Sequence, residues 1–345
     1  MMNRFRGLFL LLLLVIVINV VRSQFTSTGF PIQVLDSTSP WNTVIGPTPT
    51  LDSNSVAMIT KVKNTVVSRG YGPNLYLHYF QWTCPIHLIN TSQSVNRITI
   101  YQPNGEAYHE TVDPLGIKRV SNLPVSTTFN PDPKADGHMI VFDVALKQFY
   151  EFSRFVWINS TAANATRFDT FSWNSTGLYP AYVPGSRWWM KSVRGSGAPF
   201  IAGLVRYDEI VRGDVNHALA LAGPINRMKA LSSSPWSAEL CSPVACRNDG
   251  WEIGTDTIME GQRLQLNPSF NITALSPKSK LIAQALQIYG GYIVDNSDDF
   301  GIYLENKGPY STSPWVTVYG SDLIQLFDIP IDQFRVLQCP TIATK

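Results

Sequence analysis

The sequence has few charged residues and no excess of either sign. Lys, Arg, Asp and Glu make up 15% of the 345 residues, and 27 basic residues stand against 25 acidic ones. A protein that binds nucleic acid or an anionic membrane surface through charge carries a clear basic excess. The composition therefore argues against a nucleic-acid partner.

The familiar cofactor and nucleophile motifs are also missing. The sequence contains no Gly-x-Ser-x-Gly, no phosphate-binding loop and no dinucleotide fingerprint. The acidic run from Asp295 to Asp299 resembles the start of a calcium loop, but Gly301 is one position late and Asn306 stands where that loop needs Glu. We expect no cofactor and no bound metal.

Long apolar runs are absent apart from one near the N-terminus. Arg4 and Arg6 precede an apolar run over residues 8–21, and Ser23 supplies the small residue that a cleavage site needs. A retained signal anchor is the alternative, but the run is shorter than the about 20 apolar residues of a spanning helix. Residues 1–23 therefore predict a removable signal peptide, no stable membrane span after its removal, and a secreted protein of the extracellular space or cell wall.

Four cysteines are few, but their number is even. In an oxidising compartment they favour two disulfides. Cys241 and Cys246 are close enough to close one loop, and Cys84 would then pair with Cys339, although three pairings are possible. A zinc site is the alternative, which the spacing disfavours because it lacks a close pair at each end.

Five Asn-x-Ser/Thr sequons predict surface positions that a secretory host can glycosylate. They are Asn90, Asn159, Asn164, Asn174 and Asn271. Three of them lie between residues 159 and 176, so we expect that segment to be exposed and to lie away from the binding face.

The composition predicts a fold made mainly of short strands. Gly and Pro occur 23 times each and aromatic residues make up 12% of the chain. We predict one secreted β-rich domain over residues 24–345, built as a large β-sandwich or jelly roll with two or three peripheral helices. Apolar spacing and capping residues place helices at 55–67 and 277–289, and a β-hairpin is expected over 139–152.

Residues 199–224 hold more ionisable groups between apolar residues than any other stretch. The apolar run 201–205 predicts a buried strand, and a turn and a second strand follow it. Five polar side chains are expected at this corner: Arg206, Tyr207, Asp208, Glu209 and His217.

Each of these residues also has an ordinary structural explanation. Asp208 suits a helix N-cap, and Glu209 suits a first helical turn. Arg206 on a buried strand needs a carboxylate partner, either in the protein or in a substrate. His217 fits a core histidine as well as a proton-transfer group. Asp295 is first a turn former and second a carboxylate at a strand end.

Several motifs taken together resemble a broad group of secreted, mostly bacterial proteins that has no characterised member known to us. The motifs are SPWNT (39–43), GHMIVFD (137–143), FYEF (149–152), GLVRYDEIVRGDVNHAL (203–219), SFNI (269–272) and LSPKSKLIAQALQIYGGYIVDN (275–296). The resemblance implies that six residues occupy pattern positions of the group: His138, Arg206, Glu209, His217, Asp295 and Asn296. The chain departs from the group at two places, where Ala220 and either Leu266 or Asn267 replace expected cations.

Two classes of function fit these features. In the first, a secreted enzyme acts on an extracellular or cell-wall polysaccharide. A hydrolase would use two carboxylates such as Glu209 and Asp295, whereas a lyase would use His217 or Tyr207 as the base with Arg206 or Asn296 neutralising a uronate. His138 and Trp189 are further candidates for substrate binding. In the second class, the protein is a non-catalytic carbohydrate-binding or wall-associated structural glycoprotein.

Overall fold

The largest element is a mixed sheet of six strands. The computed structural model describes residues 24–101, 119–134, 136–179, 192–228, 239–317 and 328–344. The order of this sheet is β1-β14-β10-β13-β12-β15, with parallel pairing of β1 with β14 and of β10 with β13. Its strands are β1 (Tyr76–His78), β10 (Leu219–Gly223), β12 (Arg263–Leu266), β13 (Gly291–Asn296), β14 (Gly301–Tyr303) and β15 (Phe334–Val336).

Alternation along β10 shows how the two faces of this sheet are used. Leu219 and Leu221 point into a core shared with two helices, α1 (Ser55–Ser68) and α3 (Pro277–Ile288). Ala220 and Ala222 point to the opposite face, where a second core lies. Because successive side chains of a strand alternate between faces, large residues fill the helix side and small ones admit a close second layer.

That second layer is a four-stranded sheet in the order β2-β5-β6-β9. Its strands are β2 (Ile86–Ile89), β5 (Met139–Asp143), β6 (Gln148–Ser153) and β9 (Arg167–Ser172). Ile140, Phe142 and Phe149 pack toward Ala220 and Val294 of the large sheet. The predicted hairpin over 139–152 is confirmed as the antiparallel pair β5 and β6.

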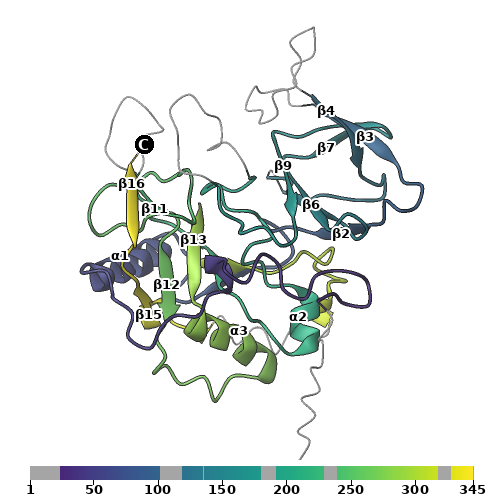
Figure 1. The fold of residues 1–345 in the computed structure, drawn as a ribbon. Coiled ribbons are helices and arrows are strands. Elements are labelled where there is room, and N and C mark those ends of the chain that lie inside the picture. The colour runs from purple at the N-terminus through teal and green to yellow at the C-terminus, as the bar shows by residue number, and fades with distance from the viewer. Residues whose placement is uncertain are drawn as a thin grey trace, which may run out of the picture.

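A third sheet covers the outer face of the second. It has the order β4-β3-β8-β7, with β3 (Arg97–Tyr101), β4 (Arg119–Pro124), β7 (Val156–Asn159) and β8 (Ala162–Asn164). Ile98 and Ala163 share an apolar core with Val141 and Phe152 of the second sheet. In Figure 1 these two sheets lie at the upper right, and the large sheet with α1 and α3 lies at the lower left.

The prediction of a strand-rich chain with a few helices is therefore confirmed, but the single sandwich or jelly roll is not what forms. The second sheet packs between the third sheet and the six-stranded sheet, and the helices add a further layer on the far face of the six-stranded sheet. The apolar run of β5 is buried at every position because the large sheet covers one of its faces and the third sheet covers the other.

The predicted helices are confirmed, whereas the predicted strand at 201–205 is wrong. Ser276 caps α3, accepting a hydrogen bond from Ser279 N, and Pro277 occupies its first turn. Residues 201–204 form a buried turn, and only Val205 makes an isolated bridge, with Leu304. The described residues also form four short helical segments: η1 (Pro40–Asn42), α2 (Tyr207–Arg212), α4 (Pro314–Thr317) and η4 (Ile331–Gln333).

The disulfide differs from the predicted pairing. Cys241 in β11 (Glu239–Ser242) bonds to Cys339, which precedes the antiparallel partner strand β16 (Thr341–Thr344). Cys84 is a buried thiol, and Cys246 Sγ lies 3.8 Å from Gly197 O. The closeness of Cys241 and Cys246 in sequence was a poor guide, because β11 is paired with a strand from the end of the chain.

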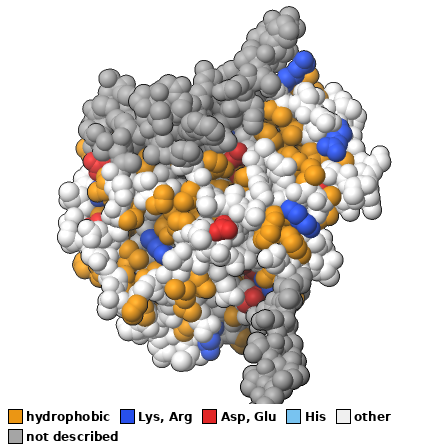
Figure 2. Space-filling model, in the orientation of Figure 1, with side chains coloured by type: hydrophobic (Ala, Val, Ile, Leu, Met, Phe, Trp, Pro, Cys, Tyr) orange, Lys and Arg blue, Asp and Glu red, His pale blue; other side chains and the backbone are white. Residues whose placement is uncertain are grey.

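The sequon asparagines lie at the surface, but the expectation that residues 159–176 are exposed and lie away from the binding face is wrong. Strands β8 and β9 in this segment are largely buried, and Thr166 and Arg167 line the cavity described below. Figure 2 shows scattered single charges among apolar and uncharged side chains on one face. None of the five sequon asparagines is buried, and the glycans stay a prediction. Among the described residues, no helix is long and apolar enough to cross a membrane; the signal at 1–23 lies outside them.

Candidate functional site

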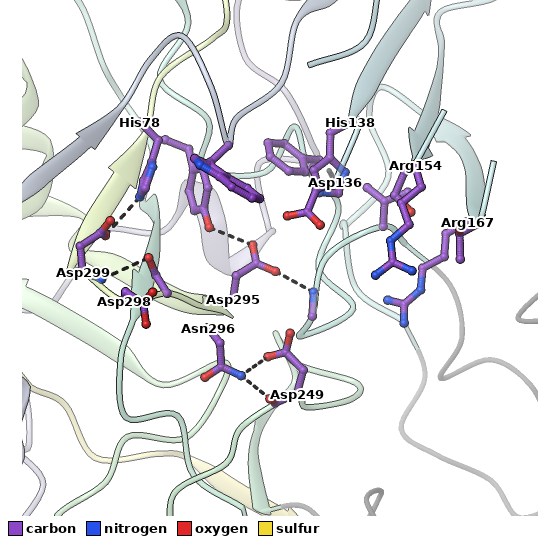
Figure 3. A pocket seen from close by; sticks show the side chains of 18 of the residues that line it. His78, Asp136, His138, Arg154, Arg167, Asp249, Asp295, Asn296, Asp298 and Asp299 are labelled. Carbon is purple, nitrogen blue, oxygen red and sulfur yellow. Dashed lines mark hydrogen bonds and ion pairs between the residues drawn. The ribbon is translucent and has the colours of Figure 1, made fainter. Parts of the chain in front are cut away.

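A cavity of about 470 Å³ opens where the large sheet meets the second sheet. The large sheet contributes His78 of β1, Asp295 and Asn296 at the end of β13, and the acidic turn that follows. The second sheet contributes the turn before β5, the end of β6 and the start of β9. Figure 3 shows these polar side chains arranged around one hollow.

Asp295 is held on three sides. Its carboxylate accepts hydrogen bonds from Arg194 Nη1 at 2.8 Å, from Gly195 N at 2.7 Å and from Tyr303 OH at 3.2 Å. Burial raises the pKa of Asp295, and repulsion from Asp249 adds to this, while Arg194 opposes it. The Asp295 carboxylate is thus fixed in orientation and supplied with donors that favour its charged form.

Asp136 enters the cavity from the other sheet on a tight turn. Gly137 has φ of 47°, and a Cβ there would lie 3.1 Å from Phe155 N, so only glycine lets the turn lie against the chain that leaves β6. Arg154 N donates to Asp136 O at 2.6 Å, and Phe155 N donates to Gly137 O at 3.1 Å. These contacts place Asp136 beside the end of β6.

The carboxyl group of Asp136 is chemically unlike that of Asp295. It is half-buried and makes no hydrogen bond with the residues that the structure describes. Burial raises its pKa, Asp249 raises it further, and Arg154 opposes the shift. A carboxyl group without donors and near another carboxylate holds its proton more readily than a clamped one.

His138 follows on the same turn and also lines the cavity. It is 9% exposed and packs on the Phe200 ring at a centroid distance of 4.5 Å. Its Nδ1 is buried and has no hydrogen-bond partner among the described residues. Burial and the charge of Arg194 lower the pKa of His138 to about 3, so the imidazole is neutral at neutral pH.

Two aromatic side chains stand at the cavity with large exposed areas. Trp82 is 43% exposed and Tyr71 is 44% exposed. Trp82 has φ of 58°, a left-handed conformation that is rare for a bulky residue. Strained residues of this kind gather at ligand sites. Exposed aromatic faces in a cavity are suited to stacking on sugar rings.

A histidine–carboxylate pair closes one side of the cavity. His78 Nε2 lies 3.2 Å from Asp299 Oδ1, and the imidazole stacks on Tyr303 with ring centroids 5.2 Å apart. Tyr303 OH also donates to the Asp295 carboxylate, so the stacked rings of His78 and Tyr303 lie next to that carboxylate.

The corner predicted from residues 199–224 is sealed. Arg206 Nη2 lies 2.8 Å from Glu209 Oε1, and His217 Nε2 lies 3.1 Å from the same oxygen. Arg206 and Glu209 are each 2% exposed, and none of the three lines the large cavity. The expectation that they surround one open cleft with Asp295 is wrong, because they neutralise one another inside the protein. We call Arg206, Glu209 and His217 the Arg206 corner.

Local helix chemistry explains this arrangement. Arg206 is the N-cap of α2, and the Glu209 carboxylate reaches back to accept from Arg206 N at 2.9 Å. Asp208, expected as the cap, is instead a first-turn residue. Gly213 ends the helix with φ of 87°, as predicted. Burial alone would raise the pKa of Glu209, but Arg206 and His217 outweigh it and the pKa is lowered.

The remaining predicted binding residues divide between the cavity and other places. Asn296 and His138 line the cavity, and Asn296 Nδ2 donates to Asp249 Oδ1 at 2.7 Å. Tyr207 lies on α2 against Trp315, away from the cavity. Trp189 lies outside the described residues. The two positions where cations were expected in the related pattern, Ala220 and Leu266, are buried in apolar cores.

Sequence reasoning missed most of the cavity. Asp136, Arg154, Arg194 and Asp249 each lie alone between turn residues and carry no local motif. The one usable signal was the Asp-Gly-His order at 136–138, in which a glycine separates two ionisable residues just before a strand. No group of three His, Cys, Asp or Glu side chains within the described ranges is arranged to hold a metal ion.

Comparisons with known proteins give no further guide. No family model, no curated protein and no solved structure matches this chain. The resemblance to a group of secreted proteins therefore stays a prediction.

Proposed function

We propose that the protein is a secreted enzyme that hydrolyses a glycan, with Asp136 as the general acid and Asp295 as its partner carboxylate. The observation that carries this proposal is that two carboxyl groups with raised pKa line one cavity in opposite surroundings. Glycoside hydrolysis needs such a pair, one group protonated and one charged.

The roles follow from the surroundings of each group. Asp136 lacks hydrogen-bond donors, so its proton is available for the oxygen of the bond that breaks. Asp295 is oriented by Arg194 and Gly195, so its charged form can accept a proton from water or attack the anomeric carbon. Trp82 and Tyr71 would stack on the sugar rings.

Two alternatives have less support. The lyase with His217 or Tyr207 as base is disfavoured because neither residue lines the cavity. A carbohydrate-binding protein without catalysis is favoured by one observation, that Asp295, Asp298 and Asp299 each contact an Arg or His side chain of the protein. Paired groups of this kind also occur in purely structural networks.

The test is the release of reducing ends from a panel of neutral and acidic polysaccharides. Wild-type protein is expected to be active, and Asp136→Asn and Asp295→Asn to lose at least about 100-fold in rate. The matched control is Asp332→Asn, an exposed carboxylate that lies 2.6 Å from Lys63 and does not line the cavity. This control is expected to keep full activity.

Substrates with an acidic phenol as leaving group separate the two roles. Such a leaving group needs no proton, so Asp136→Asn should recover most of its rate on it and Asp295→Asn should not. Glycan binding by folded wild-type protein without release from any substrate would instead establish the binding protein. Full activity of Asp136→Asn on polysaccharide would remove Asp136 from the acid role.

A further inference from the structure

The charged residues on the two sides of the cavity are partnered differently. On the large-sheet side three carboxylates each contact a basic side chain: Asp295 contacts Arg194 at 2.8 Å, Asp298 contacts Arg69 at 3.1 Å and Asp299 contacts His78 at 3.2 Å. On the second-sheet side Arg154 and Arg167 project into the hollow, as Figure 3 shows. We call these two residues the arginine wall.

Arg154 is the member of this wall that is available to a ligand. Its side chain is exposed, and among the described residues the guanidinium makes no ion pair and no hydrogen bond. Its backbone is fixed by the bond from Arg154 N to Asp136 O and has φ of 50°. Glycine adopts this left-handed conformation without strain, whereas arginine does not. Residues strained in this way gather at ligand sites, which supports a binding role for the Arg154 side chain.

Arg167 strengthens the positive character of the wall. It begins β9 opposite Ser153 of β6, which places it next to Arg154 across the strand pair. Arg154, Arg167 and His138 line the same cavity, and the charges of Arg194, Arg167 and Arg154 add to burial in lowering the pKa of His138. Arg194 is already bonded to Asp295, and Arg167 Nη1 donates to Arg194 O at 3.4 Å, so it is Arg154 whose guanidinium group the described residues leave for a ligand.

A ligand that fits such a cavity has an anionic group at one end and hydroxyl donors at the other. Carboxylates such as Asp295 and Asp298 accept hydrogen bonds from sugar hydroxyls. The guanidinium group of Arg binds a planar carboxylate through two parallel hydrogen bonds. A uronic acid carries both features on one ring.

We infer that the arginine wall binds the carboxylate of a uronic acid unit, with Arg154 as the residue that determines specificity. The inference rests on the proposed function, since it names the class of glycan that the same cavity takes. The substrate is accordingly an acidic polysaccharide, and its neutral counterpart binds more weakly.

The experiment measures binding of galacturonic acid and galactose to the purified protein by NMR titration. Neither monosaccharide contains a bond to be cleaved, so the readout does not depend on catalysis. Wild-type protein is expected to bind galacturonic acid at least about 10-fold more tightly, and high salt should reduce this preference. Glutamate, which has carboxylates but no sugar hydroxyls, should bind no better than galactose.

The variant Arg154→Gly tests the assignment without threatening the fold. Glycine suits φ of 50°, so the variant should be at least as stable as wild type while its preference for galacturonic acid falls about 10-fold. Arg154→Lys should keep part of the preference. The matched control is Lys147→Gly, which removes another cation at positive φ, 56°, at the opposite end of the β5–β6 hairpin.

Equal affinity of wild-type protein for the two sugars would overturn the inference, as would tight binding of glutamate or a preference that survives in Arg154→Gly. Failure of the proposed function looks different. If acidic sugars bind through Arg154 but no glycan is cleaved, the inference stands and the enzyme does not. If a neutral polysaccharide is cleaved equally well by Arg154→Gly, the enzyme stands and the inference does not.

Discussion

The Arg206 corner and the cavity use the same kinds of residues in opposite ways. In the corner a cation, a carboxylate and an imidazole contact one another and are almost fully removed from solvent. In the cavity the Asp136 carboxyl group and the Arg154 guanidinium group make no hydrogen bond or ion pair with the described residues. A dense run of charges in a sequence therefore marks a place where charges can satisfy one another, whereas a site needs polar groups that the fold leaves unsatisfied.

The corner also has a clear structural task. The side chain of Arg206 donates to Ile32 O at 2.8 Å, and His217 Nδ1 lies 2.9 Å from Ala218 O. Both imidazole nitrogens of His217 face oxygen acceptors, so the imidazolium form satisfies both. The corner thus links the N-terminal segment, α2 and the start of β10 through one buried network.

The largest expected difference in stability between the corner and the cavity is produced by Glu209→Gln. The change leaves Arg206 buried without its countercharge, and loss of one partner of a buried pair costs about 3–5 kcal/mol of stability. Urea unfolding of the variant beside Asp136→Asn measures the contrast, since Asp136→Asn should cost less than about 1 kcal/mol. Equal stability of the two variants would show that the corner is not a stabilising network.

The next effect concerns the pH dependence of stability through Glu151. Its carboxylate accepts from Phe200 N and Ile201 N at 2.8 Å each, yet complete burial raises its pKa to about 8. The folded protein thus binds the proton more tightly than the unfolded chain, whose Glu titrates near the ordinary value of 4.5. Stability is expected to fall as pH rises from there to about 8, by at most about 1.4 kcal/mol per pH unit from this group.

Unfolding free energies at a series of pH values, for wild type and Glu151→Gln, check this expectation. The variant should lose the downward slope, although its amide can accept only one of the two backbone hydrogen bonds and so lowers stability overall. A slope that persists unchanged in the variant would assign the pH dependence to another group.

The pH dependence of the reaction tests whether Asp136 is the general acid of the cavity. The general acid acts only while protonated, so kcat/KM should fall as pH rises through the pKa of Asp136, which is above that of an ordinary Asp. Asp136→Asn should lose this limb of the profile, and Asp332→Asn should keep it. An unchanged limb in Asp136→Asn would assign the proton to a different group.

The smallest expected effect belongs to Trp82→Gly. Loss of a stacking surface should weaken glycan binding by about 1 kcal/mol, or roughly 5-fold. Relief of the left-handed backbone should leave stability unchanged or slightly higher. Isothermal titration with an oligosaccharide and a thermal melt of the same sample measure both, and unaltered affinity would show that Trp82 does not touch the sugar.

Local signals predicted the elements that depend on near neighbours in sequence. The spacing of Ile282 and Leu286 and the cap at Ser276 located α3, and the apolar runs on each side of residue 145 located the hairpin. The order of the sheets was beyond such signals, because the pairing of β10 with β13 and β14 joins segments about seventy or more residues apart. The Cys241–Cys339 bond follows from the same kind of long-range pairing.

Three residues of the candidate site could be predicted in the same way. Asp295 and Asn296 were found because they end a strand that reads clearly, and His138 because it begins one. Asp136 and Arg154 were not found, since their importance comes from the contact of one turn with another across Gly137.

Taken alone, the sequence determined helices α1 and α3, the β5–β6 hairpin and the surface position of the sequon asparagines, because each follows from residue type and short-range spacing. The tertiary structure alone decided which charges meet. Arg206, Glu209 and His217 contact one another in the interior, whereas Asp136, Asp295 and Arg154 line a cavity. The burial and the partner of each charge are set by segments that only folding brings together.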